Sequence, residues 1–295
     1  MVLATGTASS SFEDKLFPQK YTLQSKGRLI IWEKPQIMGI LNTTPDSFYD
    51  KSRVALEKDS LLTKAEKMLQ EGATILDVGG YSSRSGAAEV TEEEEIRRTA
   101  DAISWISESF PEALISIDTF RAKVAKTGVD AGAHLVNDIS AGSLDEQMLE
   151  TVGKLKVPYI AMHMKGNPQN MQKQTEYSDI IPEILNYFAK KLDFISEFGI
   201  KDVIIDPGFG FAKTLEQNYQ ILKNLDYFHL LGLPILAGLS RKSMIYKLLE
   251  IDPKDALNGT TALNMVALLK GAKILRVHDV KEAKETLELY KQLYA

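Results

Sequence analysis

Polar and ionisable side chains recur along this chain, each directly after a short apolar segment. They are Asn42, Asp77, Asp118, Asn137, His163, Asp206, the run Ser240 to Lys242, and the pair Arg276 and His278. Any one of them has an ordinary explanation, because Asp and Asn after a strand often cap the next helix or begin a turn. Eight in succession indicate a shared site, since the carboxyl ends of parallel barrel strands meet at one mouth.

One group of these residues suits an anion. Arg276 and His278 are two positions apart, so in an extended chain both face the same side. Together with Asn42 they are able to bind a phosphate or diphosphate through charge-assisted hydrogen bonds. An Asn oxygen near phosphates is a plausible ligand for Mg²⁺, which prefers oxygen and keeps several waters. The alternative for His278 is that it merely precedes a helix, beside Asp279.

A second group suits a planar heterocycle that carries several N–H donors. Two carboxylates and an amide, from Asp118, Asp206 and Asn137, are able to accept those hydrogen bonds. A buried carboxylate needs such partners, because leaving it unpaired costs several kcal/mol. Lys242 would donate to a carbonyl oxygen or ring nitrogen. The turn after Asp206 would place aromatic rings beside the pocket.

These residues need elements that bring them together, and the chain has a regular rhythm of apolar segments. The segments are 37–41, 75–78, 114–117, 135–136, 159–162, 203–205, 235–237 and 274–277. Near-continuous hydrophobicity, rather than alternation, is typical of parallel strands buried on both faces. Amphipathic stretches with helix signals separate them, at 59–71, 96–110, 179–198 and 259–270.

Eight strands that alternate with helices predict the α/β class, as an eight-stranded parallel (β/α)8 TIM barrel. The loop after residue 42 lacks the glycine fingerprint of dinucleotide-binding sheets, which weakens that alternative. Segments 21–24 and 28–32 predict a short N-terminal hairpin, able to plug the N-terminal end of the barrel. We expect a flexible leader over residues 1–20 and a single domain over 21–295.

Composition excludes several function classes. The 295 residues carry a net charge of −5, which disfavours a nucleic-acid partner. The chain has no cysteine, which excludes disulfides, thiol nucleophiles and Cys-based zinc sites, and fits a cytoplasmic location. No signal peptide and no apolar run of membrane-spanning length is evident, so no membrane partner is expected. The acidic run that begins at Thr91 is typical of a helix start rather than a cation site.

From about residue 28 to 295, the chain resembles the dihydropteroate synthase family. The matching segments are 38–48, 77–80, 116–119, 137–140, 162–164, 206–214, 238–243 and 276–279. Several are weak alone, but their order and spacing together are highly specific. The resemblance implies a transferase of folate biosynthesis, which condenses a hydroxymethyl-dihydropterin diphosphate with p-aminobenzoate and releases diphosphate.

The resemblance also implies residue roles. The pterin would be held by Asp118, Asn137, Asp206, Lys242 and Arg276. The diphosphate would be bound by Asn42, Arg276 and His278, with Asn42 as the ligand of Mg²⁺. The p-aminobenzoate pocket would be formed by Ser83, Arg84, Phe211, Lys213, Lys242 and Ser243, and the helix that starts near Ser243 would face the carboxylate. The catalytic set would be Asn42, Asp118, Arg276 and His278.

The second loop departs from the family pattern. The family often has the sequence Gly-Gly-Glu-Ser-Thr-Arg-Pro-Gly at this loop. Residues 79–86 of this chain retain a hydroxyl side chain at Ser83 and the positive charge at Arg84. They carry Ser85 where the family has proline. Without the φ restriction of proline, we expect a more mobile loop and altered discrimination between p-aminobenzoate and sulfonamides.

The resemblance further implies a homodimer through the late helices. The apolar face formed by residues 262, 263, 265, 266 and 269 is one candidate surface, and the alternative is that this face packs on the barrel.

Two other functions stay open. One is a pterin-binding methyltransferase domain, which would share Asp118 and Asn137 but has no need of Arg276 and His278. The other is a catalytically silent barrel that binds pterin or acts as a scaffold. Diphosphate release that depends on p-aminobenzoate and Mg²⁺ would separate all three.

Overall fold

Eight parallel strands form the centre of the computed structural model, which describes residues 20–43, 51–81 and 90–294. The strands are β3 (Gln36–Asn42), β4 (Ile75–Gly79), β5 (Leu114–Asp118), β6 (Leu135–Asp138), β7 (Tyr159–Met162), β8 (Val203–Asp206), β9 (Leu236–Ala237) and β10 (Ile274–Val277). Their order in the sheet is β8-β7-β6-β5-β4-β3-β10-β9. A parallel bridge between Ile205 and Ile235 joins the two edges, so the sheet closes into the predicted barrel.

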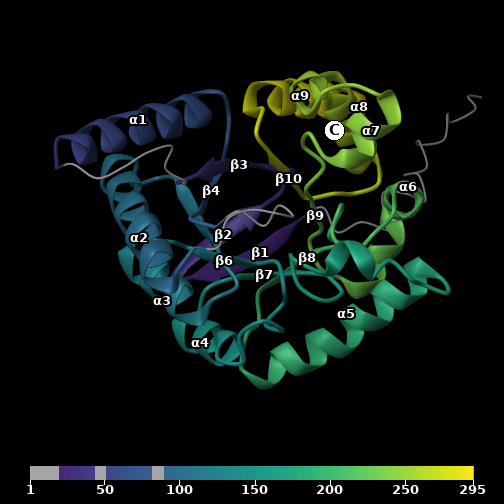
Figure 1. Cartoon of the computed structure of the whole chain (residues 1–295), viewed down its shortest axis with the longest axis horizontal. Helices are drawn as coiled ribbons and strands as arrows, with labels where there is room; N and C mark the ends of the chain where they lie inside the picture. The colour runs from purple at the N-terminus through teal and green to yellow at the C-terminus, as the bar shows by residue number, and fades with distance from the viewer. Residues whose placement is uncertain (1–19, 44–50, 82–89, 295) are drawn as a thin grey trace, which may run out of the picture.

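Helices follow the strands and form an outer ring around them (Figure 1). In the described residues they are α1 (Lys51–Gln70), α2 (Glu92–Ser109), α3 (Ala122–Ala131), α4 (Met148–Leu155), α5 (Ile180–Glu197), α6 (Leu215–Lys223), α7 (Ser243–Leu249), α8 (Leu257–Leu269) and α9 (Val280–Tyr294). Thr91 caps α2 as predicted, because its hydroxyl accepts a hydrogen bond from the Glu94 amide. None of the helices described is long and apolar enough to cross a membrane.

The interior of the barrel is a packed apolar layer. Each strand contributes one inward residue to it, namely Met38, Ile75, Leu114, Leu135, Ile160, Ile204, Leu236 and Ile274. The predicted hairpin is confirmed as β1 (Tyr21–Ser25) and β2 (Arg28–Trp32), paired antiparallel. Its buried side chains, Trp32 among them, pack against this layer, and the hairpin lies over the centre of the ring of helices (Figure 1). The hairpin therefore plugs the N-terminal end of the barrel, as expected.

Above that apolar layer the barrel interior becomes polar. Side chains alternate along a strand, so the residue two positions further on faces the interior again. The eight positions of this second layer are Ile40, Asp77, Ser116, Asn137, Met162, Asp206, Gly238 and Arg276. The next inward positions, which include Asn42, Asp118, Ser240 and His278, lie at the carboxyl ends of the strands. Because inward-facing residues recur every second position along each strand, the polar ones among them gather at the carboxyl end of the barrel.

Candidate active site

The centre of the mouth is the Arg276 guanidinium, which lies between two carboxylates. Its Nε donates to Asp77 Oδ2 at 2.6 Å, and a terminal nitrogen donates to Asp118 Oδ2 at 2.5 Å. Asn137 Nδ2 donates to the same Asp77 oxygen at 3.1 Å. The structure therefore brings together Arg276, Asp118 and Asn137, three of the residues predicted to hold the pterin.

Burial and the neighbouring charges have opposing effects on the pKa values of Asp118 and Arg276. Burial raises the pKa of Asp118 to about 7; the Arg276 charge opposes the shift, and the Asp77 carboxylate adds to it. Burial favours the neutral form of Arg276, yet the carboxylates of Asp77 and Asp118 outweigh it and raise the pKa of the guanidinium. Arg276 is therefore a fixed cation, whereas burial makes Asp118 easier to protonate than an ordinary carboxylate.

Asp77 belongs to this cluster although no role was predicted for it. Its side chain is 1% exposed and holds Arg276 and Asn137 in position through one carboxylate oxygen. The other oxygen, Oδ1, has no hydrogen-bond partner among the described residues, and neither has the buried hydroxyl of Ser116, which is its register neighbour on β5. The signal was present in the sequence, because Asp77 lies two positions after the inward-facing Ile75.

Asp206 and Lys242 form the other side of the mouth. Asp206 Oδ1 accepts a hydrogen bond from the Gly208 amide at 2.7 Å, and burial raises the Asp206 pKa against the charge of Lys242. Burial lowers the pKa of Lys242 to about 8, with the Asp206 charge opposing that shift. The Lys242 ammonium donates to the backbone oxygen of Phe209 and lies 5.1 Å from the Phe211 ring centroid.

An apolar, aromatic wall adjoins these charges. Phe120 and Phe211 both pack against a small buried cluster at the mouth, made of Ile139, Met162, Met164, Met171 and Ala212. The helix predicted near Ser243 is confirmed, since α7 begins at that residue. An aromatic ring and an adjacent cation are thus both available to a second ligand.

His278 lies at the end of β10, beside Ser240 and half-buried. Its Nδ1 is 3.0 Å from the Ser240 hydroxyl, and its backbone amide donates to the same hydroxyl at 3.2 Å. Arg241 turns away from the mouth, because its guanidinium donates twice to Asp279, each bond at 2.8 Å. Of the basic residues in this loop, the structure therefore presents Lys242 and not Arg241 to the site.

The remaining predicted residues have different positions. Asn42 is exposed at the end of β3, where its register partner is Gly79. Ser83, Arg84 and Ser85 lie outside the described residues, as does the leader up to residue 19, so the predictions made for them stay predictions.

Lys213 and His163 form a buried pair beside the turn after β8. The Lys213 ammonium is buried, 3.0 Å from His163 Nδ1, and donates to the backbone oxygens of Phe211 and His163. The His163 ring packs edge-on against Tyr187 of α5, and its pKa falls to about 2 because of burial and the Lys213 charge. These three contacts tie Lys213 to the turn after β8 and to His163, and its predicted role in the p-aminobenzoate pocket stays a prediction.

The comparisons with known proteins agree with this geometry. The pterin binding enzyme family matches residues 38–278. A dihydropteroate synthase of Escherichia coli K12 is 41% identical over 269 residues, which cover 90% of this chain and 94% of the relative. One from Synechocystis is 45% identical over 260 residues, covering 86% and 88%.

Solved structures extend the likeness to the fold. A Yersinia pestis dihydropteroate synthase in a sulfonamide drug complex superposes with a TM-score of 0.86 at 40% identity, covering 92% of this chain and 99% of that one. A Xanthomonas albilineans dihydropteroate synthase with 4-aminobenzoic acid gives 0.84 at 34% identity, covering 93% and 98%. The chain therefore belongs to the pterin binding enzyme family and, within it, to the dihydropteroate synthases.

Proposed function

We propose that the mouth joins the methylene carbon of a hydroxymethyl-dihydropterin diphosphate to the amine of p-aminobenzoate and releases diphosphate. The observation that carries this assignment is the Arg276 guanidinium, held between the buried carboxylate of Asp77 and that of Asp118 at the carboxyl ends of the strands. A fixed cation beside several acceptors suits a substrate with a ring rich in N–H donors and an anionic tail.

The pterin ring lies among Asp118, Asn137, Asp206 and Lys242 in this proposal. The two carboxylates and the amide accept from the ring N–H groups, and Lys242 donates to its carbonyl oxygen or ring nitrogen. The donors of the ring satisfy buried acceptors that would otherwise cost free energy. Because Asp77 already orients Arg276 and Asn137, little reorganisation accompanies binding.

The bond between the methylene carbon and the diphosphate oxygen breaks first, and the electron pair leaves with the diphosphate. Arg276 and His278 stabilise the departing charge. The positive charge left on the methylene group spreads into the dihydropterin, where the neighbouring carboxylates of Asp77, Asp118 and Asp206 favour it. The neutral amine of p-aminobenzoate then attacks the carbon and loses a proton, so no protein nucleophile is required.

The residues present fit Mg²⁺ as an ion bound chiefly by the substrate. Among the described residues, no group of three or more His, Asp or Glu side chains could enclose a metal. Mg²⁺ usually keeps several waters and takes one or two protein oxygens together with substrate phosphates. The exposed side chain of Asn42 would supply such an oxygen beside the diphosphate. When bound, the ion would neutralise charge on the leaving group.

The p-aminobenzoate ring would lie against Phe211, with Lys242 and Ser243 beside it. Support comes from the apolar cluster under Phe211 and from the Lys242 ammonium near that ring. Ser83 and Arg84 complete this pocket in the proposal. Lys213 holds the turn that carries Phe211, and its contact with the substrate stays a prediction.

A homodimer is proposed through α8. Leu269 of that helix is 43% exposed, and Leu248 and Leu249 of α7 are also exposed, so apolar surface near α8 stays accessible in the single chain. Of the face predicted for the dimer, Leu263 and Val266 pack in part against the core, whereas Ala262 and Leu269 are exposed. Sedimentation velocity would report the oligomeric state directly.

The test of the function is diphosphate release from pterin diphosphate, p-aminobenzoate and Mg²⁺. We expect turnover that needs all three, and an Arg276→Lys variant that folds, since it keeps a cation between the carboxylates, but loses roughly 10²–10³-fold in kcat, as for one lost transition-state donor. Arg97→Lys, on the outer surface of α2, is the matched control. Methyl transfer from a methylpterin, or pterin binding without diphosphate release, would overturn the proposal, as would an Arg276→Lys variant of near-normal kcat.

A further inference from the structure

A buried ion pair joins α2 to the segment after β5. Glu95 is fully buried, and its Oε2 accepts a hydrogen bond from Arg121 at 2.6 Å. Burial raises the Glu95 pKa, while Thr119 and Arg121 oppose that shift. An ion pair in this setting is expensive to desolvate, and it is retained only where its remaining hydrogen bonds are satisfied.

One end of this pair is anchored to the pterin side of the mouth. The Thr119 hydroxyl donates to Glu95 Oε1 at 2.7 Å, and the Thr119 amide donates to the backbone oxygen of Asn137 at 3.0 Å. Thr119 directly follows Asp118. Thr119 therefore connects the Glu95 carboxylate to the backbone of both predicted pterin ligands, Asp118 and Asn137.

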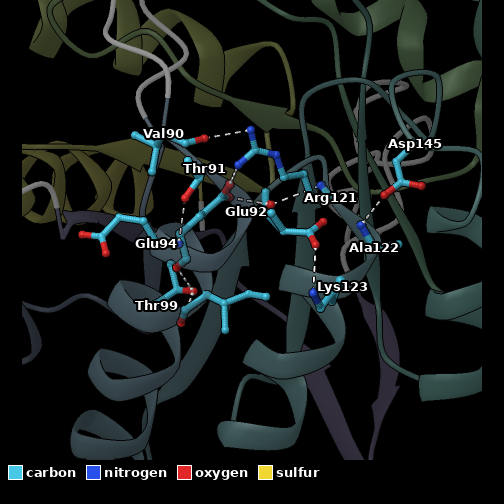
Figure 2. A network of polar contacts seen from close by, with 12 residues as sticks. Val90, Thr91, Glu92, Glu94, Thr99, Arg121, Ala122, Lys123 and Asp145 are labelled. Atoms are coloured by element: carbon cyan, nitrogen blue, oxygen red, sulfur yellow. Dashed lines mark hydrogen bonds and ion pairs between the residues drawn. The ribbon is translucent and has the colours of Figure 1, made fainter.

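The other end reaches the two residues that flank the segment 82–89. Arg121 donates to the backbone oxygen of Val90 at 2.9 Å, as Figure 2 shows, and its guanidinium lies 5.5 Å from the Tyr81 ring centroid. Tyr81 in turn packs edge-on against Phe120, with ring centroids 5.3 Å apart. A single guanidinium thus contacts both flanks.

The backbone at Gly80 also packs closely against α2. A Cβ added at Gly80 would lie 2.9 Å from Thr99 Cγ2 and 3.2 Å from Glu95 Cγ, closer than side chains normally pack. The backbone before Tyr81 therefore rests directly on the helix face that carries Glu95. The position of Tyr81 is set by the pair from two directions, through this backbone contact and through the guanidinium.

We propose that Glu95 and Arg121 are a positioning pair for the second substrate, which fixes Tyr81 and Val90 relative to Asp118 and Asn137. The inference rests on the proposed function. The substrate that the pair serves is p-aminobenzoate for the following reason. Arg121 and Tyr81 pack on Phe120, and Phe120 contacts the same apolar cluster as Phe211, against which the p-aminobenzoate ring is proposed to lie. A displaced Tyr81 and Phe120 would alter that aromatic wall and leave the polar pterin cluster in place.

A nearby ion pair provides the contrast. Lys123 and Glu92 also join α3 to α2, at 3.2 Å, but both side chains are partly solvent-exposed. Exposed pairs of this kind contribute little to stability. No contact of Lys123 with Tyr81 or Val90 is found in the described residues, so Lys123→Met removes an α2–α3 ion pair without touching the flanks. It is the matched control.

The experiment compares Arg121→Met, Arg121→Lys and Lys123→Met with the wild type. The measurements are the melting temperature, kcat, KM for each substrate, and the Kd of 6-hydroxymethylpterin. Lysine keeps a charge beside Glu95 but lacks the planar fork that also reaches Val90 and stacks on rings. We expect Arg121→Met to raise the KM for p-aminobenzoate by about tenfold, the scale of a lost charge-assisted hydrogen bond, with the pterin Kd within about twofold.

Arg121→Lys should regain much of the melting temperature while its KM for p-aminobenzoate stays raised, and Lys123→Met should match the wild type. Lower melting temperatures with a wild-type KM in both Arg121 variants would overturn the inference, because the pair would then be purely structural. An equal rise in the pterin Kd would also overturn it. Absence of turnover in the wild type would instead overturn the proposed function.

Discussion

At the scale of single residues, the mouth is a set of buried charges whose titration the barrel controls. Arg276 stays protonated because two carboxylates flank it, whereas burial brings the pKa of Asp118 up to about 7 and that of Lys242 down to about 8. The two residues proposed to accept from and donate to the pterin therefore change charge within a narrow range of pH. Asp118 is in its useful form as a carboxylate, favoured by higher pH, and Lys242 in its useful form as an ammonium, favoured by lower pH.

A bell-shaped pH dependence of kcat/KM for the pterin diphosphate follows. Asp118 gains a proton as the pH falls through about 7 and stops accepting from the ring, while Lys242 loses its proton as the pH rises through about 8 and loses its charge. We expect the acid limb to flatten in Asp118→Asn and the alkaline limb in Lys242→Gln, both at reduced activity. A substrate diphosphate that titrates nearby is common to all variants, so an acid limb unchanged in Asp118→Asn would contradict the assignment.

At the scale of elements, the sequence predicted the regular parts because each is a local pattern. All eight barrel strands and the hairpin were predicted correctly from apolar runs and turn signals, whereas the start of α7 followed only from the family resemblance. Strand periodicity also contains the signal for Asp77, and helix periodicity the signal for Glu95, which shares the inward stripe of α2 with Thr99, Ala102 and Ile106. The acidic run around Glu95 was interpreted only as a helix start, so its buried member was missed.

The positions of His163 and Lys213 could not be predicted in this way. Both belong to irregular segments after strands, where the backbone leaves the alternating pattern. The His163 ring packs against Tyr187 and Phe188 of α5, from a different part of the chain, and the Lys213 ammonium lies against that ring. Tertiary packing of this kind leaves no local sequence signal.

The turn after β8 gives a prediction at this scale. Gly208 has φ of +74°, and a Cβ there would lie 2.1 Å from the backbone oxygen of His163. Gly199 has the same φ, but open space surrounds it. Gly199→Ala should cost about 1–2 kcal/mol for the left-handed conformation alone, whereas Gly208→Ala should cost at least about 3 kcal/mol, because backbone must move as well.

Urea unfolding would measure both costs. Gly208 also donates its amide to Asp206, so Gly208→Ala should weaken pterin binding, whereas Gly199→Ala should not. Equal costs for the two variants would show that the close approach to His163 is absent in solution.

At the scale of the whole molecule, the apolar packing that stabilises the barrel and the polar residues of the proposed active site lie at opposite ends of the barrel axis. The hairpin and the apolar layer occupy one end, and the polar layer with the mouth occupies the other. The hairpin therefore lies far from the mouth and has no need to touch the substrate. The hairpin is expected to act on the stability of the barrel, since it shields eight inward-facing apolar side chains from water.

Trp32 is the residue that tests this division of the barrel. Its side chain is 2% exposed within the apolar layer, whereas Ile31, next to it on the same strand, is 47% exposed on the outer face. Trp32→Ala should lower the free energy of unfolding by about 3–5 kcal/mol, as large-to-small changes in a core do, and Ile31→Ala by less than about 1 kcal/mol. Below its melting temperature, the Trp32→Ala enzyme should keep kcat and both KM values close to wild type, because the mouth lies at the opposite end. Loss of turnover in the folded variant would mean that the two ends are coupled, and that the hairpin contributes to the geometry of Asp77 and Arg276 through the layer between them.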